Sequence, residues 1–195
     1  NDAFDLGFPE TCEALLLVEV SGSERQTMFE TQALEGLLKR FQPQRLDLAT
    51  EPEACKRLWK ARKGTVAAYG RIQPAFYVHD CVIPRSRLTE VLQGIYEAGE
   101  RYGLVVANVF HAGDGNLHPN LLFDPDDAAM VERVFAAGEE ILTLCLKVGG
   151  TLSGEHGIGI EKAHFMERLY SEADLDRMRA VKQLIDPEGL ANPGK

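Results

Sequence analysis

An Asp-Gly turn at Asp114-Gly115 constrains the fold of this 195-residue chain more than any other local feature. The run GLVVANVFHA at 103–112 precedes the turn, and HPNLLF at 118–123 follows it. Asp-Gly between two runs rich in apolar residues is typical of a β-hairpin. The sequence therefore predicts two antiparallel strands that bring His111 and His118 toward each other.

The remaining pattern alternates between strands and helices. Short apolar or alternating runs predict further strands at 13–20, 45–50 and 75–84. Helical spacing and capping patterns predict helices that end near residues 40, 69, 101 and 147. A glycine-rich loop at 149–159 and two short helices follow. This order predicts an α+β fold, a ferredoxin-like antiparallel sheet with helices on one face, elaborated by a C-terminal helical segment. We expect residues 1–148 to form this domain and residues 149–195 to pack on it.

Composition excludes some classes of partner. The net charge is −9, from 30 acidic and 21 basic residues, which argues against nucleic acid and anionic membranes. No apolar run approaches the roughly 18 residues that a membrane-spanning helix needs. The four cysteines include no CxxC pair, and this indicates a reduced protein of cytoplasmic type.

Two histidines and a carboxylate form a candidate metal site. Imidazole is the commonest metal ligand in proteins, and the hairpin presents two rings. The loop TLSGEHGIG at 151–159 adds Glu155, with His156 beside it and glycines that permit a close approach. Two histidines plus one carboxylate suit catalytic zinc, iron or manganese. The alternative is that these residues only flank tight turns, and we interpret His79 and His164 as structural.

Two long motifs resemble those of one enzyme family. HAGDGNLHP at 111–119 and GGTLSGEHGIGIEK at 149–162 are similar to the C-terminal cap domain of FAD-linked 2-hydroxy acid oxidoreductases. This family includes the glycolate oxidase FAD-binding subunit, D-lactate dehydrogenase and D-2-hydroxyglutarate dehydrogenase. Shorter matches occur in the family's order: LWKAR at 58–62, Asp80 followed by IPR at 83–85, and DPEGLANPGK at 186–195. The resemblance implies a cap domain of the vanillyl-alcohol-oxidase type, with FAD held mainly by an N-terminal FAD-binding domain that is absent from this chain.

The resemblance also implies roles for individual residues. These are metal ligation by His111, His118 and Glu155, base catalysis by His156, binding of the substrate carboxylate by Arg62, and a place near the substrate for Asn120. The implied cofactors are FAD and a divalent metal, with zinc preferred and iron or manganese as alternatives. Val78 stands where some relatives carry a substrate-binding lysine. This departure favours a small 2-hydroxy acid over one with a second, distal carboxylate.

The implied reaction is oxidation of glycolate, or of D-lactate, to the 2-oxo acid with hydride transfer to the flavin. We expect the isolated chain to be inactive. The implied partners are the substrate, the FAD-binding domain of the same protein, an iron–sulfur subunit and a second flavin-domain subunit. The implied location is cytoplasmic, with attachment to the inner membrane through these subunits as an alternative.

Two other functions are compatible with the same residues. The first is that of a stand-alone metal-dependent hydrolase. The second is that of a non-catalytic module that binds a metabolite or a partner. Hydrolysis by the isolated chain would favour the first alternative. A folded protein that binds no metal would favour the second.

Overall fold

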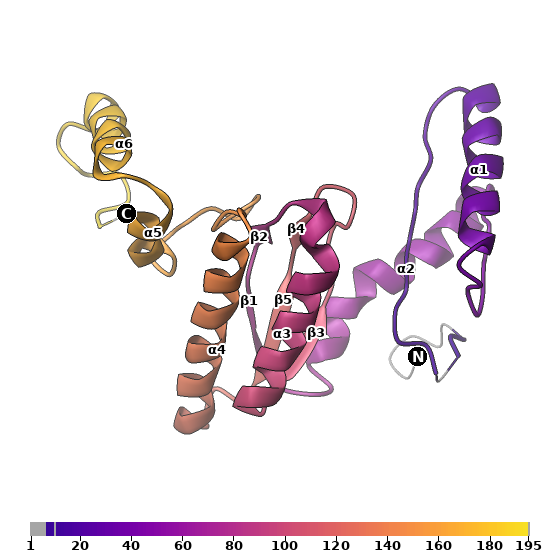
Figure 1. The fold of residues 1–195 in the computed structure, drawn as a ribbon, viewed down its shortest axis with the longest axis horizontal. Coiled ribbons are helices and arrows are strands. Elements are labelled where there is room, and N and C mark those ends of the chain that lie inside the picture. The colour runs from indigo at the N-terminus through magenta and orange to yellow at the C-terminus, as the bar shows by residue number, and fades with distance from the viewer. Residues whose placement is uncertain (1–6, 10, 195) are drawn as a thin grey trace. The chain divides into compact units, whose positions relative to one another are not determined.

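The computed structural model describes residues 7–9 and 11–194. The chain divides into two compact units, Asn1–Ala68 and Tyr69–Lys195, which we describe separately (Figure 1). The sequence placed a division at residues 148 and 149 instead, and that division stays a prediction. Within the described residues, no helix is both long and apolar enough to cross a membrane.

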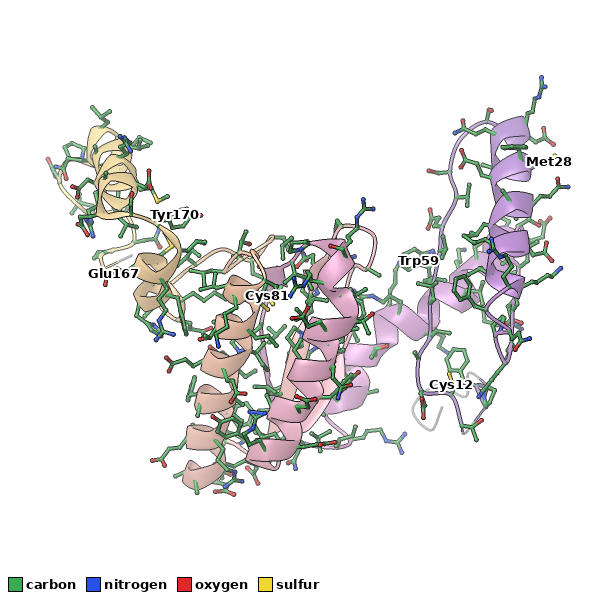
Figure 2. All side chains as sticks on the ribbon, in the orientation of Figure 1. Cys12, Met28, Trp59, Cys81, Glu167 and Tyr170 are labelled. Carbon is green, nitrogen blue, oxygen red and sulfur yellow. The ribbon has the colours of Figure 1, made fainter. Side chains whose placement is uncertain are left out.

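The first unit contains the helix α1 (Glu24–Lys39) and nearly all of α2 (Pro52–Tyr69). Both helices were predicted from capping patterns. Ser23 is the N-cap of α1, and its side chain accepts a hydrogen bond from the backbone N–H of Gln26. No residue of α1 is buried, and Met28 projects from the helix with 61 % of its surface exposed (Figure 2).

The strands predicted at 13–20 and 45–50 are wrong. Neither segment forms a strand in the described part of the chain, although the first is an apolar run and the second alternates between apolar and polar residues. A strand is stable when a neighbouring strand pairs its backbone groups and its apolar face is covered. Leu16 and Leu48 are 62 % and 65 % exposed, so these segments have neither kind of support.

The second unit is built on two small antiparallel sheets. One has the strand order β1-β5-β3, formed by Ala75–Val78, Pro119–Phe123 and Val105–Asn108. The other pairs β2 (Cys81–Val82) with β4 (Asn116–Leu117). The predicted pairing of the two runs around the Asp-Gly turn is confirmed, with Val105 opposite Leu122 and Asn108 opposite Pro119. The single strand predicted at 75–84 is instead two strands in different sheets, separated by His79 and Asp80.

Two helices of the second unit pack against the three-stranded sheet. α3 (Leu88–Tyr102) follows a 3-10 turn at Arg85–Arg87 and contacts β3, whereas α4 (Ala128–Lys147) contacts β5. The two helices also pack against each other and lie on the same side of the sheet (Figure 1). Together with the antiparallel pairing, this arrangement confirms the predicted α+β class.

The C-terminal helical segment was also predicted. It consists of a 3-10 turn at Ala163–Phe165, α5 (Met166–Leu169) and α6 (Glu172–Ile185). Ser171 opens α6 with a capping box in which Asp174 is the reciprocal partner, as the sequence indicated. The segment is described as far as Gly194.

The hydrophobic core lies between the sheets and the helices of the second unit. It includes Ile95 of α3, Leu121 of β5 and Ile141 of α4, none of which is accessible to solvent. Burying each such side chain contributes ~1.5–3 kcal/mol. Cys81 also lies inside this region, with its sulfur 3.1 Å from that of Cys145 (Figure 2). The hydrogen bond between these thiols, together with burial, raises the pKa of Cys145 far above its ordinary value.

Candidate metal centre

The hairpin turn places two histidines on either side of a short loop. The backbone N–H of His111 donates to the carbonyl of Asn116 at 2.9 Å, and the N–H of Gly115 donates to the carbonyl of His111 at 3.2 Å. Gly115 has a φ of 81°, a conformation that favours glycine. The rings of His111 and His118 lie 5.3 Å apart between centroids, nearly perpendicular to each other. The turn therefore brings the two imidazoles together, as predicted.

The glycine-rich loop is tied to a single buried carboxylate. Oδ2 of Asp80 accepts hydrogen bonds from the Ser153 hydroxyl at 2.6 Å and from the backbone N–H groups of Gly154, Glu155 and His156 at 3.0, 3.1 and 2.8 Å. Burial alone would raise the pKa of Asp80. The four donors outweigh burial and lower this pKa to about 2, so the carboxylate is charged at neutral pH. The loop thus presents Glu155 and His156 on a backbone that Asp80 holds.

The hairpin and the loop converge on Glu155. Its Oε1 lies 3.1 Å from Nε2 of His118, and 3.8 Å from Nε2 of both His111 and His156. The rings of His118 and His156 stack with centroids 5.0 Å apart. One donor atom from each of Asp80, His118, Glu155 and His156 lies within 4.8 Å of all the others. Two ligands in a tetrahedral zinc site, each bound at about 2.0–2.2 Å, lie about 3.3–3.6 Å apart, which is close to the distances between Glu155 and the histidines.

His118 has the properties of a free metal ligand. Only 12 % of its side chain is exposed, and within the described residues its buried Nε2 makes no hydrogen bond despite the nearby Glu155 carboxylate. Burial and the neighbouring His156 lower the pKa of His118 more than Glu155 and Asp80 raise it. The ring is therefore neutral at neutral pH and offers a lone pair to a metal. The donor set fits a divalent ion that binds nitrogen and oxygen.

Three further candidate side chains, unlike that of His118, are open to solvent. About half of each of His111, Glu155 and His156 is exposed, at 48 %, 51 % and 45 %. A ligand or a covering segment can therefore reach them, whereas Asp80 beneath them is completely buried.

The two predicted substrate residues belong to different units. Arg62 belongs to α2 in the first unit. Asn120 is only 3 % exposed, and its Nδ2 donates to the carbonyls of His118 at 2.7 Å and Ala107 at 3.1 Å. The amide of Asn120 thus supports the hairpin that carries His118. The assigned roles of both residues, like those of the metal ligands and His156, stay predictions.

Sequence reasoning missed the contribution of Asp80. Its motif was noted, but no function was assigned to it. The available indication was its position, because Asp80 is the only acidic residue in the apolar run AFYVHDCVIP at 75–84. An acid in such a run is buried at a cost and needs hydrogen-bond donors. The sequence did not show that these donors come from a loop more than 70 residues later.

Comparisons with known proteins agree with the motifs. A family model described as "FAD linked oxidases, C-terminal domain" matches residues 1–195. The glycolate oxidase subunit GlcD of Escherichia coli strain K12 is 41 % identical over 195 residues, which are 100 % of this chain and 39 % of that protein. GlcD of Bacillus subtilis strain 168 is 31 % identical over 195 residues, 100 % of this chain and 42 % of that protein.

A plant enzyme is also similar to the chain. The mitochondrial D-lactate dehydrogenase (cytochrome) of Arabidopsis thaliana is 30 % identical over 182 residues, which are 92 % of this chain and 32 % of the enzyme. The chain thus spans between about a third and two fifths of the length of these curated relatives.

Proposed function

The chain belongs to the family of C-terminal domains of FAD linked oxidases, and from this membership we propose that it is the substrate- and metal-binding cap of an FAD-dependent 2-hydroxy acid oxidoreductase. The observation that carries the proposal is the convergence of His111, His118 and His156 on the Glu155 carboxylate. Relatives named as glycolate oxidase subunits and D-lactate dehydrogenase support this reaction class.

We assign glycolate as the substrate, with D-lactate as the alternative. The relatives' names support both compounds, and glycolate is named for the two with the higher identities cited above. Val78, on β1, has an apolar side chain and offers no cation for a second carboxylate. A small 2-hydroxy acid needs no such partner, whereas 2-hydroxyglutarate does.

His111, His118 and Glu155 are the residues we assign to the metal. Zinc suits two imidazoles and a carboxylate best, and iron or manganese are alternatives. When bound, such an ion supplies Lewis acidity that lowers the pKa of a coordinated hydroxyl. The half-exposed positions of His111 and Glu155 leave room for a substrate beside them.

His156 is the base in this proposal. Its backbone N–H is fixed by Asp80, while its ring is 45 % exposed and stacks on His118. An imidazole in this position would accept the proton of the substrate hydroxyl at Nε2. Arg62 would bind the substrate carboxylate through its guanidinium fork, and Asn120 would act near the substrate by supporting the hairpin that carries His118.

FAD binding is assigned to a separate domain of the full-length protein. A backbone loop that cradles a phosphate points free N–H groups toward it. In the glycine-rich loop, the N–H groups of Gly154, Glu155 and His156 already donate to Asp80, so this loop does not fit the FAD pyrophosphate. When bound by the full-length protein, FAD would supply the two-electron acceptor that oxidation of a 2-hydroxy acid requires.

The proposal includes partners and a location. We place the full-length protein in the cytoplasm, together with an iron–sulfur subunit and a second flavin-domain subunit. The word "subunit" in the names of the two bacterial relatives supports an assembly of this kind.

Metal analysis tests the ligand assignment first. We expect one zinc per chain after reconstitution, and loss of that zinc in His111→Ala and His118→Ala with an unchanged circular dichroism spectrum. His164→Ala is the matched control, because His164 is an exposed histidine outside the cluster. Zinc binding that survives in both hairpin variants would contradict the assignment.

Steady-state kinetics of the full-length protein test the reaction. We expect oxidation of glycolate, and His156→Ala should lower kcat by about 10²–10⁴-fold, as expected for loss of a general base. The same measurement on His164→Ala should give the wild-type rate. Hydrolytic activity without FAD would favour the hydrolase alternative, and a folded protein without metal or activity would favour the binding module.

A further inference from the structure

We propose that Asp80 is the positioning residue of the donor cluster, which consists of His111, His118, Glu155 and His156. Its buried carboxylate holds the 153–156 backbone so that Glu155 and His156 face His118, and it does not itself bind the metal. The inference rests on the proposed metal-binding function. It assigns a role to Asp80, which belongs to one of the matching motifs but for which the resemblance implies no role.

The hydrogen bonds of Asp80 are concentrated on one oxygen. Oδ2 accepts from the Ser153 hydroxyl and from three consecutive backbone N–H groups, at distances between 2.6 and 3.1 Å. The carbonyl of Asp80 accepts a further bond from the N–H of Gly154 at 3.1 Å. An oxygen with four donors has no lone pair left for a metal ion. Oδ2 of Asp80 therefore binds the loop and not a metal ion.

The loop has no other regular support. No helix or strand covers residues 152–158, so its backbone N–H groups depend on local partners. Ser153 completes the arrangement, because its hydroxyl accepts from the N–H of Gly157 at 2.8 Å while it donates to Asp80. A concave row of N–H groups of this kind normally binds an anion, and here the anion is a side chain of the same protein.

Close packing fixes the loop against the hairpin. A Cβ on Gly154 would lie 2.7 Å from Cγ2 of Val82 and 2.9 Å from Oδ1 of Asn116, so only glycine fits there. Val82 and Asn116 are paired residues of β2 and β4. Asp80 directly precedes β2, and the loop is therefore attached to the sheet that also leads into His118.

The second oxygen of Asp80, Oδ1, is buried and faces the side chains that we assign to the metal. Oδ1 lies 3.6 Å from Nε2 of His118 and 3.2 Å from the backbone nitrogen of Glu155. Lys162 is only 5 % exposed, and its charge acts on Asp80. The low pKa of Asp80 agrees with a carboxylate that stays charged beneath the site. Such outer-sphere groups orient the residues that bind a metal directly.

The test combines zinc affinity with amide hydrogen exchange in the purified chain. Asp80→Asn keeps the side-chain shape but places an NH₂ group or a weaker acceptor against the loop donors. We expect zinc affinity to fall by about 10–100-fold, as for other outer-sphere partners, and the amides of residues 154–156 to exchange faster in the metal-free protein.

Ser153→Ala gives a milder version of the same change. It removes one hydrogen bond and leaves the carboxylate, so we expect a loss of about three- to tenfold in zinc affinity with partial loss of amide protection. This variant keeps the proposal testable if Asp80→Asn does not fold.

Asp186→Asn is the matched control. Asp186 also accepts hydrogen bonds from two backbone N–H groups, those of Leu190 and Ala191 at 2.9 and 3.0 Å, but beyond the end of α6. We expect faster exchange at those two amides and unchanged zinc affinity. Equal losses of zinc affinity in Asp186→Asn and Asp80→Asn would overturn the inference, because the effect would then be general destabilisation.

Two further results would overturn it. Complete loss of zinc in Asp80→Asn with full protection of residues 154–156 would make Asp80 a ligand. Wild-type zinc affinity in the same variant despite faster exchange would make its role purely structural. A wild-type chain that binds no zinc is a different result, since it overturns the proposed metal function itself.

Discussion

His79 is a neutral imidazole enclosed by apolar neighbours. It is 1 % exposed, neither ring nitrogen has a hydrogen-bond partner within the described residues, and its ring lies against that of Tyr77 at 4.6 Å between centroids. Burial, and to a lesser extent the charge of Lys162, lowers its pKa from 6.5 to about 3. Helix α4 passes so close that a Cβ on Gly138 would lie 2.4 Å from Nε2 of His79. His79, which the sequence predicted to be structural, thus links the stability of the fold to pH, because its protonation favours the unfolded chain.

Acid should destabilise the fold through His79. The unfolded chain binds a proton at His79 near pH 6.5, whereas the folded chain binds it only near pH 3. This contribution to stability is complete above pH 6.5 and is lost as the pH falls toward 3, at ~1.4 kcal/mol per pH unit. His79→Phe removes the titration, and we expect a flatter dependence of the unfolding free energy between pH 7 and 4.5.

Urea unfolding of the purified chain at several pH values measures this effect. The range ends at pH 4.5 because Asp80, with its pKa lowered from 3.8 to about 2, adds a loss of stability in stronger acid. His164→Gln, at an exposed position, is the control and should keep the wild-type slope. A slope that is the same in His79→Phe and the wild type would contradict the prediction.

At the scale of elements, the hairpin depends on one glycine of its turn. Gly115 combines a φ of 81° with close contact, because a Cβ there would lie 2.2 Å from the carbonyl oxygen of Ile83. The N–H of Ile83 donates to the carbonyl of Gly115 at 3.0 Å, so β2 and the turn are joined at this point. Gly113 lies in the same turn, but a Cβ there would meet nothing within 4 Å.

The two glycines therefore form a matched pair for mutation. Gly115→Ala should lower the unfolding free energy by at least ~2 kcal/mol, because both strain and a backbone clash oppose it. Gly113→Ala should change it by less than ~1 kcal/mol. Thermal or urea unfolding of the two variants gives the comparison, and equal stabilities would show that the turn tolerates a side chain at both positions.

At the scale of the whole molecule, burial is distributed unequally between the two compact units. Among the buried apolar residues of the described chain, only Ala61 precedes residue 69. Residues 69–195 contain the core residues, the candidate donor side chains of His111, His118, Glu155 and His156, and Asp80 beneath them. Cooperative folding requires a buried apolar core, and the second unit contains one.

We predict that residues 69–195 fold when expressed alone. The fragment should unfold in a single transition by circular dichroism and bind zinc with the affinity of the full chain. Residues 1–68, as a separate peptide, should show no cooperative transition, since the residues described in this range bury almost no apolar side chain. A fragment 69–195 without fixed tertiary structure would show that the first unit is needed for folding.

Local patterns in the sequence determined most of the helices and the hairpin. Capping residues such as Ser23 and Ser171 and the Asp114-Gly115 turn act through neighbours only a few residues away, so they are readable without a structure. The same locality makes His111 and His118 predictable as a pair. The motif around Glu155 could be recognised, but its distance to the hairpin could not.

Only the tertiary structure decided which apolar runs become strands and what anchors the site. The runs at 13–20 and 45–50 have strand-like composition but no partner strand in the described residues, and the run at 75–84 divides at Asp80 between two sheets. The donors that hold Asp80 lie 73 to 76 residues farther along the chain. Strand pairing and the satisfaction of a buried charge both depend on groups that are distant in sequence, and short-range patterns carry no information about those groups.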